Sequence, residues 1–114
     1  MLFVDTSFWA ALLNERDDRH EDAAQMLQRW STQELVTTNH VRGETWTLLI
    51  QRQGHRWAVA YLDRLERSAH LRLTGVSDEL EREALRWLRQ HDERPYSFVD
   101  ATSFALMRSL TIRE

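Results

Sequence analysis

The 114-residue chain contains no cysteine and no lysine, and it has only one proline and three glycines. Without cysteine, the chain can form neither disulfides nor thiolate metal sites. Without lysine, phosphate binding by a P-loop and Schiff-base catalysis are excluded. All fifteen basic side chains are arginines. The scarcity of proline and glycine, together with 42% hydrophobic residues, is typical of a mostly helical globular domain.

Long apolar runs are also missing. No segment approaches the roughly 20 apolar residues that span a bilayer, and Asp5 interrupts any signal-peptide pattern. We therefore expect a single cytoplasmic domain over residues 1–114, with no membrane contact. The net charge of −3 argues against general nucleic-acid binding and leaves room for local arginine patches.

Short apolar runs alternate with helical periodicities, which predicts an α/β fold. Strands are expected at 2–4, 35–38 and 70–73. Helices are expected at 8–14, 20–30, 39–54, 55–69, 78–90 and from 97 onward. Strands separated by helices pair in parallel, so the sheet should be parallel. Thr6 and Ser7 are predicted as N-caps of the first helix, and Gly54 as the end of the third.

Apolar spacing on these helices also predicts which side chains face the core. Trp57 and Tyr61 in the fourth helix and Leu85 in the fifth fall on the inward stripe. The five tryptophans are expected to pack between helices rather than to stack on bases. Gly43 is expected to allow close approach of another backbone segment.

Three acids occupy matching positions: Asp5 follows the first strand, Glu44 lies early in the third helix, and Asp100 lies in the first turn of the last helix. Each has a local explanation, since Asp5 and Asp100 can cap their helices. The carboxyl ends of parallel strands meet at one edge, however, and ligands bind there in open α/β sheets. Converging carboxylates repel one another unless a hard cation is present, which predicts a Mg²⁺ or Mn²⁺ site. Such an ion can polarise a phosphodiester and activate water.

Three motifs carry a resemblance to a known family. They are Phe3–Phe8, Val36–Asn39 followed by Glu44 and Thr45, and Ser97–Met107. In order and spacing over the whole chain, they resemble PIN-domain proteins, above all the VapC-type toxins of bacteria and archaea. The resemblance implies a three-layer α/β/α fold and a Mg²⁺- or Mn²⁺-dependent endoribonuclease. It also implies inhibition by a cognate antitoxin and a homodimer.

For individual residues, the resemblance implies that Asp5, Glu44 and Asp100 are three of the family's four acids, with Asp5 and Asp100 as direct metal ligands. Thr6, Ser7 and Ser97 would orient these acids or meet a phosphate. The family usually continues into a further strand that ends in a fourth acid, whereas this sequence stops at Arg113 and Glu114. We therefore expect the C-terminal strands to be missing and the first strand to have an open side.

Two alternatives remain at this stage. A catalytically impaired PIN-like remnant would bind a protein or RNA without cutting, and metal-dependent cleavage that Asp5→Asn or Asp100→Asn abolishes would exclude it. A receiver or haloacid-dehalogenase-like phosphatase is disfavoured because both rely on lysine, and the phosphatase pattern places an Asp where Ser7 stands. Arginines near the motifs that could help to bind RNA, or could simply be solvated on outer faces, are Arg42, Arg52, Arg56, Arg94 and Arg108. Asp92, in the loop before Ser97, could lie near the rim of the pocket or be a solvated loop acid.

Overall fold

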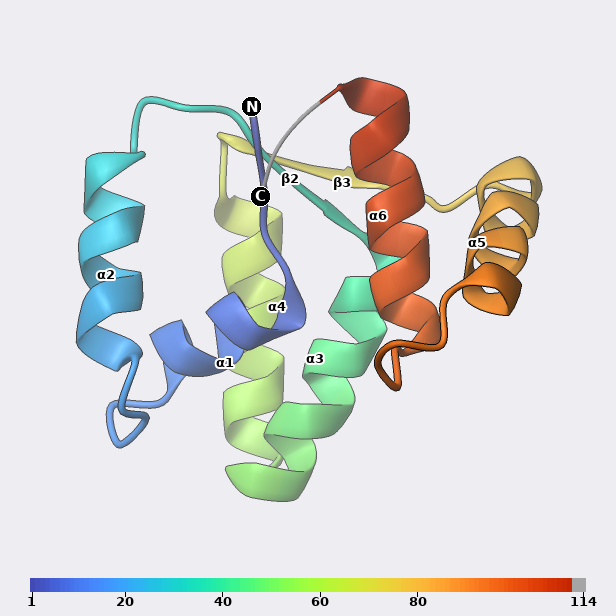
Figure 1. Cartoon of the computed structure of the whole chain (residues 1–114). Coiled ribbons are helices and arrows are strands. Elements are labelled where there is room, and N and C mark those ends of the chain that lie inside the picture. The colour runs from blue at the N-terminus through green and yellow to red at the C-terminus, as the bar shows by residue number, and fades with distance from the viewer. Residues whose placement is uncertain (112–114) are drawn as a thin grey trace.

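Three strands and six helices alternate along the part of the chain that the structure, a computed structural model, describes, residues 1–111 (Figure 1). The expectation that the C-terminal strands are missing after Arg113 and Glu114 concerns residues that lie outside this range. The elements are β1 (Leu2–Phe3), α1 (Thr6–Leu13), α2 (His20–Arg29), β2 (Leu35–Thr38), α3 (Asn39–Arg52), α4 (His55–Arg67), β3 (Leu71–Thr74), α5 (Asp78–Gln90) and α6 (Phe98–Leu110).

The strands form one parallel sheet in the order β1-β2-β3. Leu2 is paired with Leu35, and Leu35 in turn with Leu71, so β2 lies in the middle. The predicted α/β class and the short parallel sheet are therefore confirmed. Within residues 1–111, β1 has a neighbouring strand on one side only.

The start of α1 differs from the prediction, because Asp5 and not Thr6 or Ser7 is the N-cap. The Asp5 backbone is extended (φ −99°, ψ 178°), and its carboxylate accepts a hydrogen bond from the Phe8 amide. Thr6 and Ser7 are the first two residues of the helix itself. Since all three residue types cap helices well, the end of β1 decides which one takes the position.

The two glycines of the third and fourth helices have different surroundings. Gly54 follows α3 with a φ of 101°, a left-handed conformation that favours glycine, and its amide donates to the Leu49 carbonyl. Gly43 lies inside α3, and a Cβ there would meet no atom within 4 Å in the described part of the chain. The predicted close approach at Gly43 is therefore wrong.

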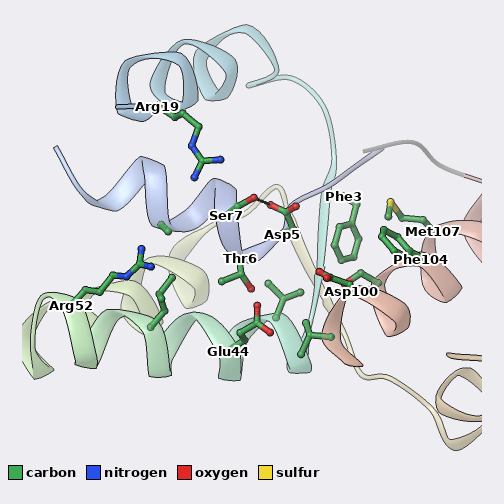
Figure 2. Close-up of a pocket in the computed structure, with 15 residues that line it drawn as sticks. Phe3, Asp5, Thr6, Ser7, Arg19, Glu44, Arg52, Asp100, Phe104 and Met107 are labelled. Carbon is green, nitrogen blue, oxygen red and sulfur yellow. Dashed lines mark hydrogen bonds between the residues drawn. The ribbon is translucent and has the colours of Figure 1, made fainter. Parts of the chain in front are cut away.

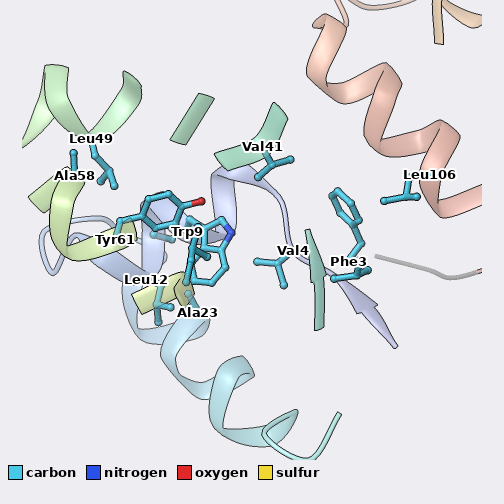
Figure 3. Packing of buried hydrophobic residues seen from close by; sticks show 13 residues of the cluster. Phe3, Val4, Trp9, Leu12, Ala23, Val41, Leu49, Ala58, Tyr61 and Leu106 are labelled. Atoms are coloured by element: carbon cyan, nitrogen blue, oxygen red, sulfur yellow. The ribbon is translucent and has the colours of Figure 1, made fainter. Parts of the chain in front are cut away.

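The core forms where α1, α3 and α4 meet the sheet (Figure 3). Trp9 and Tyr61 are buried at its centre, with ring centroids 5.5 Å apart in an edge-to-face arrangement. Trp57 and Leu85, predicted to face inward, are 47% and 46% exposed. Because α4 packs mainly against α3, and α5 against α6, one neighbouring helix covers only part of each apolar stripe, so the prediction that these two side chains face inward is wrong.

Helix packing brings the ends of β1 and β2 next to the start of α6. α1 packs against α2 and α3, and α3 packs against α6. Figure 1 shows α2 and α5 at opposite ends of the molecule, with the other four helices between them. No helix within residues 1–111 has the length and apolar character to cross a membrane.

Candidate active site

A pocket of about 270 Å³ lies between α1, α3 and α6, and all three predicted acids line it (Figure 2). Asp5 comes from the end of β1, Glu44 from α3 and Asp100 from the first turn of α6. They are separated by many residues in sequence, so only the fold brings them to one place. Thr6 and Ser7 line the same pocket, whereas Ser97 does not.

Asp5 is held by its helix and by the sheet. Its Oδ1 accepts hydrogen bonds from the Ser7 hydroxyl at 2.9 Å and from the Phe8 amide at 3.0 Å. One residue earlier, the Val4 carbonyl accepts a hydrogen bond from the buried Thr37 hydroxyl of β2. The end of β1 is thus fixed to its neighbour, which sets where the Asp5 carboxylate stands.

Glu44 lies half-buried on α3, about a turn and a half after β2. The start of α3 is anchored by Thr38, whose hydroxyl accepts a hydrogen bond from the Val41 amide, and Val41 is fully buried. Figure 2 shows the side chains of Glu44 and Thr6 pointing toward each other. The Thr6 hydroxyl is buried and has no hydrogen-bond partner among the described residues, so this wall of the pocket holds an unsatisfied polar group.

Asp100 combines a structural contact with exposure to the pocket. It forms a capping box with Ser97: the Asp100 amide donates to the Ser97 hydroxyl, and the Ser97 amide donates to Asp100 Oδ2. Of the two carboxylate oxygens, Oδ2 is therefore engaged in the cap. The other oxygen can face the pocket that the residue lines. Ser97 acts on Asp100 through the cap and not from within the cavity.

Two arginines line the same pocket as the acids. Arg52, at the end of α3, lines the pocket as the sequence suggested, and so does Arg19, which the sequence analysis missed. Arg19 lies at the start of α2, and no local pattern reveals that the turn after α1 returns it to the acids. The other candidates, Arg42, Arg56, Arg94, Arg108 and Asp92, are not among the residues that line this pocket; Arg42 lines a separate cavity beside β3.

Comparison with known proteins identifies the fold family. Residues 2–113 match the family described as PIN domain. The chain belongs to the PIN domain family. Its PIN domain is 52% identical over 115 aligned positions to the 23S rRNA-specific endonuclease VapC20 from two strains of Mycobacterium tuberculosis, CDC 1551 / Oshkosh and H37Rv. Each match covers 99% of this chain and 85% of the relative.

A solved structure gives the same result at the level of the fold. The crystal structure of Mycobacterium tuberculosis VapC20, described as a sarcin–ricin loop cleaving toxin, superposes with a TM-score of 0.89 at 52% identity. The alignment covers 98% of this PIN domain and 85% of that chain. The predicted family, fold class and ribonuclease type are therefore confirmed.

The donors in this PIN domain suit a hydrated divalent ion. Within residues 1–111, no group of three or more histidines, cysteines or acids is close enough to enclose a metal ion by itself. The pocket nevertheless offers carboxylate oxygens and an unpartnered threonine hydroxyl. Mg²⁺ keeps several of its waters and needs only one or two carboxylates. The donor set fits such an ion, and it does not form a closed cage of protein ligands.

Proposed function

We propose that this chain is a divalent-metal-dependent endoribonuclease that hydrolyses 23S rRNA in its sarcin–ricin loop, as the toxin of a toxin–antitoxin pair. One observation carries the proposal: Asp5, Glu44 and Asp100 line one pocket in a chain that is 52% identical to a 23S rRNA-specific endonuclease. That identity, over 99% of the chain, favours cleavage over the catalytically impaired remnant.

The residues would divide the work as follows. Asp5 and Asp100 would hold Mg²⁺ or Mn²⁺, and Glu44 would complete the acidic set. An ion held there would supply Lewis-acid polarisation of the phosphodiester and would lower the pKa of a water. Ser7 fixes one oxygen of Asp5, and Ser97 fixes Asp100 through the capping box. The unpartnered Thr6 hydroxyl is buried and faces Glu44, so its role would be to orient that acid.

The partners follow from the same proposal. The substrate is RNA, an antitoxin protein inhibits the enzyme, and two copies form a homodimer. Because ribosomal RNA is the proposed target, the site of action is the cytoplasm. The antitoxin and the dimer rest on the resemblance to VapC-type toxins.

The proposal is tested by incubating the 114-residue chain with intact ribosomes and with purified 23S rRNA, in Mg²⁺, in Mn²⁺ and in EDTA. We expect one dominant cut in the sarcin–ricin loop that needs the metal. Asp100→Asn should reduce the cleavage rate by at least about a hundredfold, the scale of losing a charge-stabilising group at a reacting centre. Primer extension maps the cut.

The matched control is Asp92→Asn, because Asp92 is an exposed acid close in sequence that does not line the pocket. It should cleave like the unsubstituted chain. Cleavage that persists in EDTA would contradict the metal dependence. No cleavage by a chain that gives a cooperative thermal melt would contradict the nuclease function and favour the remnant. A metal-dependent cut elsewhere would retain the nuclease and reject the sarcin–ricin loop as its target.

A further inference from the structure

The pocket has two chemically different ends. Arg19, at the start of α2, and Arg52, at the end of α3, line one end, and Figure 2 shows both side chains extending toward α1 from the helices on either side of it. Phe104 and Met107 lie on the α6 side, next to Asp100. The acids thus stand between a cationic end and an apolar end.

Neither arginine is strongly engaged within the protein. The Arg19 side chain is 65% exposed, and its ion pair with Asp17 is long, at 3.7 Å, a surface contact that contributes little. Arg52 is exposed and has no ion pair among residues 1–111 that the structure reveals. Both guanidinium groups therefore keep donors for a ligand.

The position of Arg19 argues against a purely structural role. Arg19 is the N-cap residue of α2 and makes no side-chain capping hydrogen bond. Arginine is not among the preferred N-caps, and the positive end of the helix dipole repels a cation there. A cation at this position raises the positive potential at the mouth of the pocket, which suits an incoming anion.

We propose that Arg19 and Arg52 form a clamp for an RNA backbone phosphate next to the one that is cut. The RNA then crosses the pocket from α2 toward α6, with its backbone at the arginines and a nucleobase at the Phe104 end. Two cations also offset the repulsion between the substrate and three acids. The proposal deepens the proposed nuclease function, because it assigns residues that position the same substrate.

The test measures RNA binding separately from cleavage. Fluorescence anisotropy is recorded in EDTA with the Asp100→Asn chain, which keeps RNA intact, and with two labelled probes: a sarcin–ricin loop hairpin and an unrelated single-stranded RNA. Arg19→Gln and Arg52→Gln are added to this background one at a time and together. The matched controls are Arg29→Gln and Arg86→Gln, two exposed arginines that do not line the pocket.

We expect each clamp substitution to weaken binding about fivefold at low salt, on both probes alike, because phosphate contacts do not read sequence. Between about 50 and 200 mM salt, the slope of log K against log[salt] should flatten by about 0.7 for each phosphate contact that is lost. A merely structural role for either arginine would leave this slope unchanged. The controls should change affinity less than about twofold, and thermal melts should show that all variants fold.

Unchanged affinity and slope in the double variant would overturn the clamp. Equal losses in the control variants would also overturn it, because the effect would then come from overall charge. If the clamp variants weaken binding while the unsubstituted chain cleaves no RNA in Mg²⁺ or Mn²⁺, the nuclease function fails and the phosphate site stands. The two proposals can therefore fail independently.

Discussion

Two of the three acids hold a helix in place as well as line the pocket. Asp5 caps α1, and Asp100 completes the capping box of α6. A substitution by alanine would remove both the cap and the carboxylate, and lost caps cost about 1 kcal/mol. Asparagine keeps an oxygen that can accept the capping hydrogen bond and removes the charge. For this reason asparagine variants separate the chemistry of these residues from their structural contribution.

Tyr61 offers a residue-level test of the core. Burial raises the pKa of its hydroxyl to about 12 and outweighs the lowering effects of the nearby Thr45 hydroxyl and of Arg42. The Thr45 and Tyr61 hydroxyls lie close together without the geometry of a hydrogen bond. The folded chain therefore keeps this proton above pH 10, where the unfolded chain loses it. The contribution of this group to the free energy of unfolding is fully present below pH 10 and is lost as the pH rises toward 12. Two pKa units correspond to about 2.7 kcal/mol.

We expect the unsubstituted chain to lose about 2–3 kcal/mol of unfolding free energy from this group between pH 10 and 12. Tyr61→Phe should remove this component. At pH 7 it should change stability by less than about 1 kcal/mol, because the hydroxyl has no hydrogen-bond partner among the described residues. Urea unfolding at several pH values measures both effects. Tyr96→Phe is the control and should retain the alkaline loss; an unchanged alkaline loss in Tyr61→Phe would contradict the assignment.

At the scale of elements, the glycines Gly43 and Gly54 should respond to alanine in opposite directions. Gly43 lies within α3 beside open space, so Gly43→Ala should stabilise the chain by about 0.5–1 kcal/mol. Gly54 has a φ of 101° between α3 and α4, so Gly54→Ala should destabilise it by about 1 kcal/mol or more. Thermal melts should show shifts of several degrees in opposite directions. Shifts of the same sign in the two variants would refute this account.

Most elements were predictable because periodic apolar residues and helix caps are local signals. Ser77, for example, caps α5 as expected. Local signals fail where several residues suit one position: Asp5, Thr6 and Ser7 all cap well, and only the path of β1 selects Asp5. They also cannot state which neighbouring helix covers an apolar face; α4 packs mainly against α3, and Trp57 is left exposed.

The sequence predicted the acids of the candidate site but not all of its arginines. The three acids were identifiable because each lies just after a strand or within the first two turns of a helix, and parallel strands end at one edge. Arg19 was missed because its place depends on how the chain turns between α1 and α2. Sequence spacing alone does not fix the direction of that turn.

At the scale of the whole molecule, charge and shape give different information. Eighteen acids against fifteen arginines make the chain weakly anionic, so it has no overall attraction for RNA. Binding must therefore come from local groups, such as the arginines at the pocket. The sheet, in contrast, has no strand on the outer edge of β1 within the described residues 1–111, which leads to the last prediction.

We predict that two copies associate through the open side of β1. The amides of Leu2 and Val4 donate to the carbonyls of Glu34 and Val36, so the Phe3 amide between them points to the other side, where no strand lies within residues 1–111. An apolar groove of about 200 Å³ adjoins it and is lined by Leu2, Phe3, Val4, Asp5, Phe8, Met26, Leu27, Trp30 and Leu35. An open strand edge beside apolar surface promotes pairing with another chain.

Met26 provides the test, because its side chain lines this groove and is 47% exposed. Met26→Glu places a charge in the contact without disturbing the core, so it should shift the dimer toward monomer by at least about tenfold in dissociation constant, the cost of desolvating an unpaired charge. Sedimentation equilibrium over a range of concentrations measures this. Ile50→Glu, at a 39% exposed position on α3 outside the groove, is the control and should dimerise normally. A dimer that Met26→Glu leaves intact would place the contact elsewhere, and a chain that stays monomeric throughout would refute self-association.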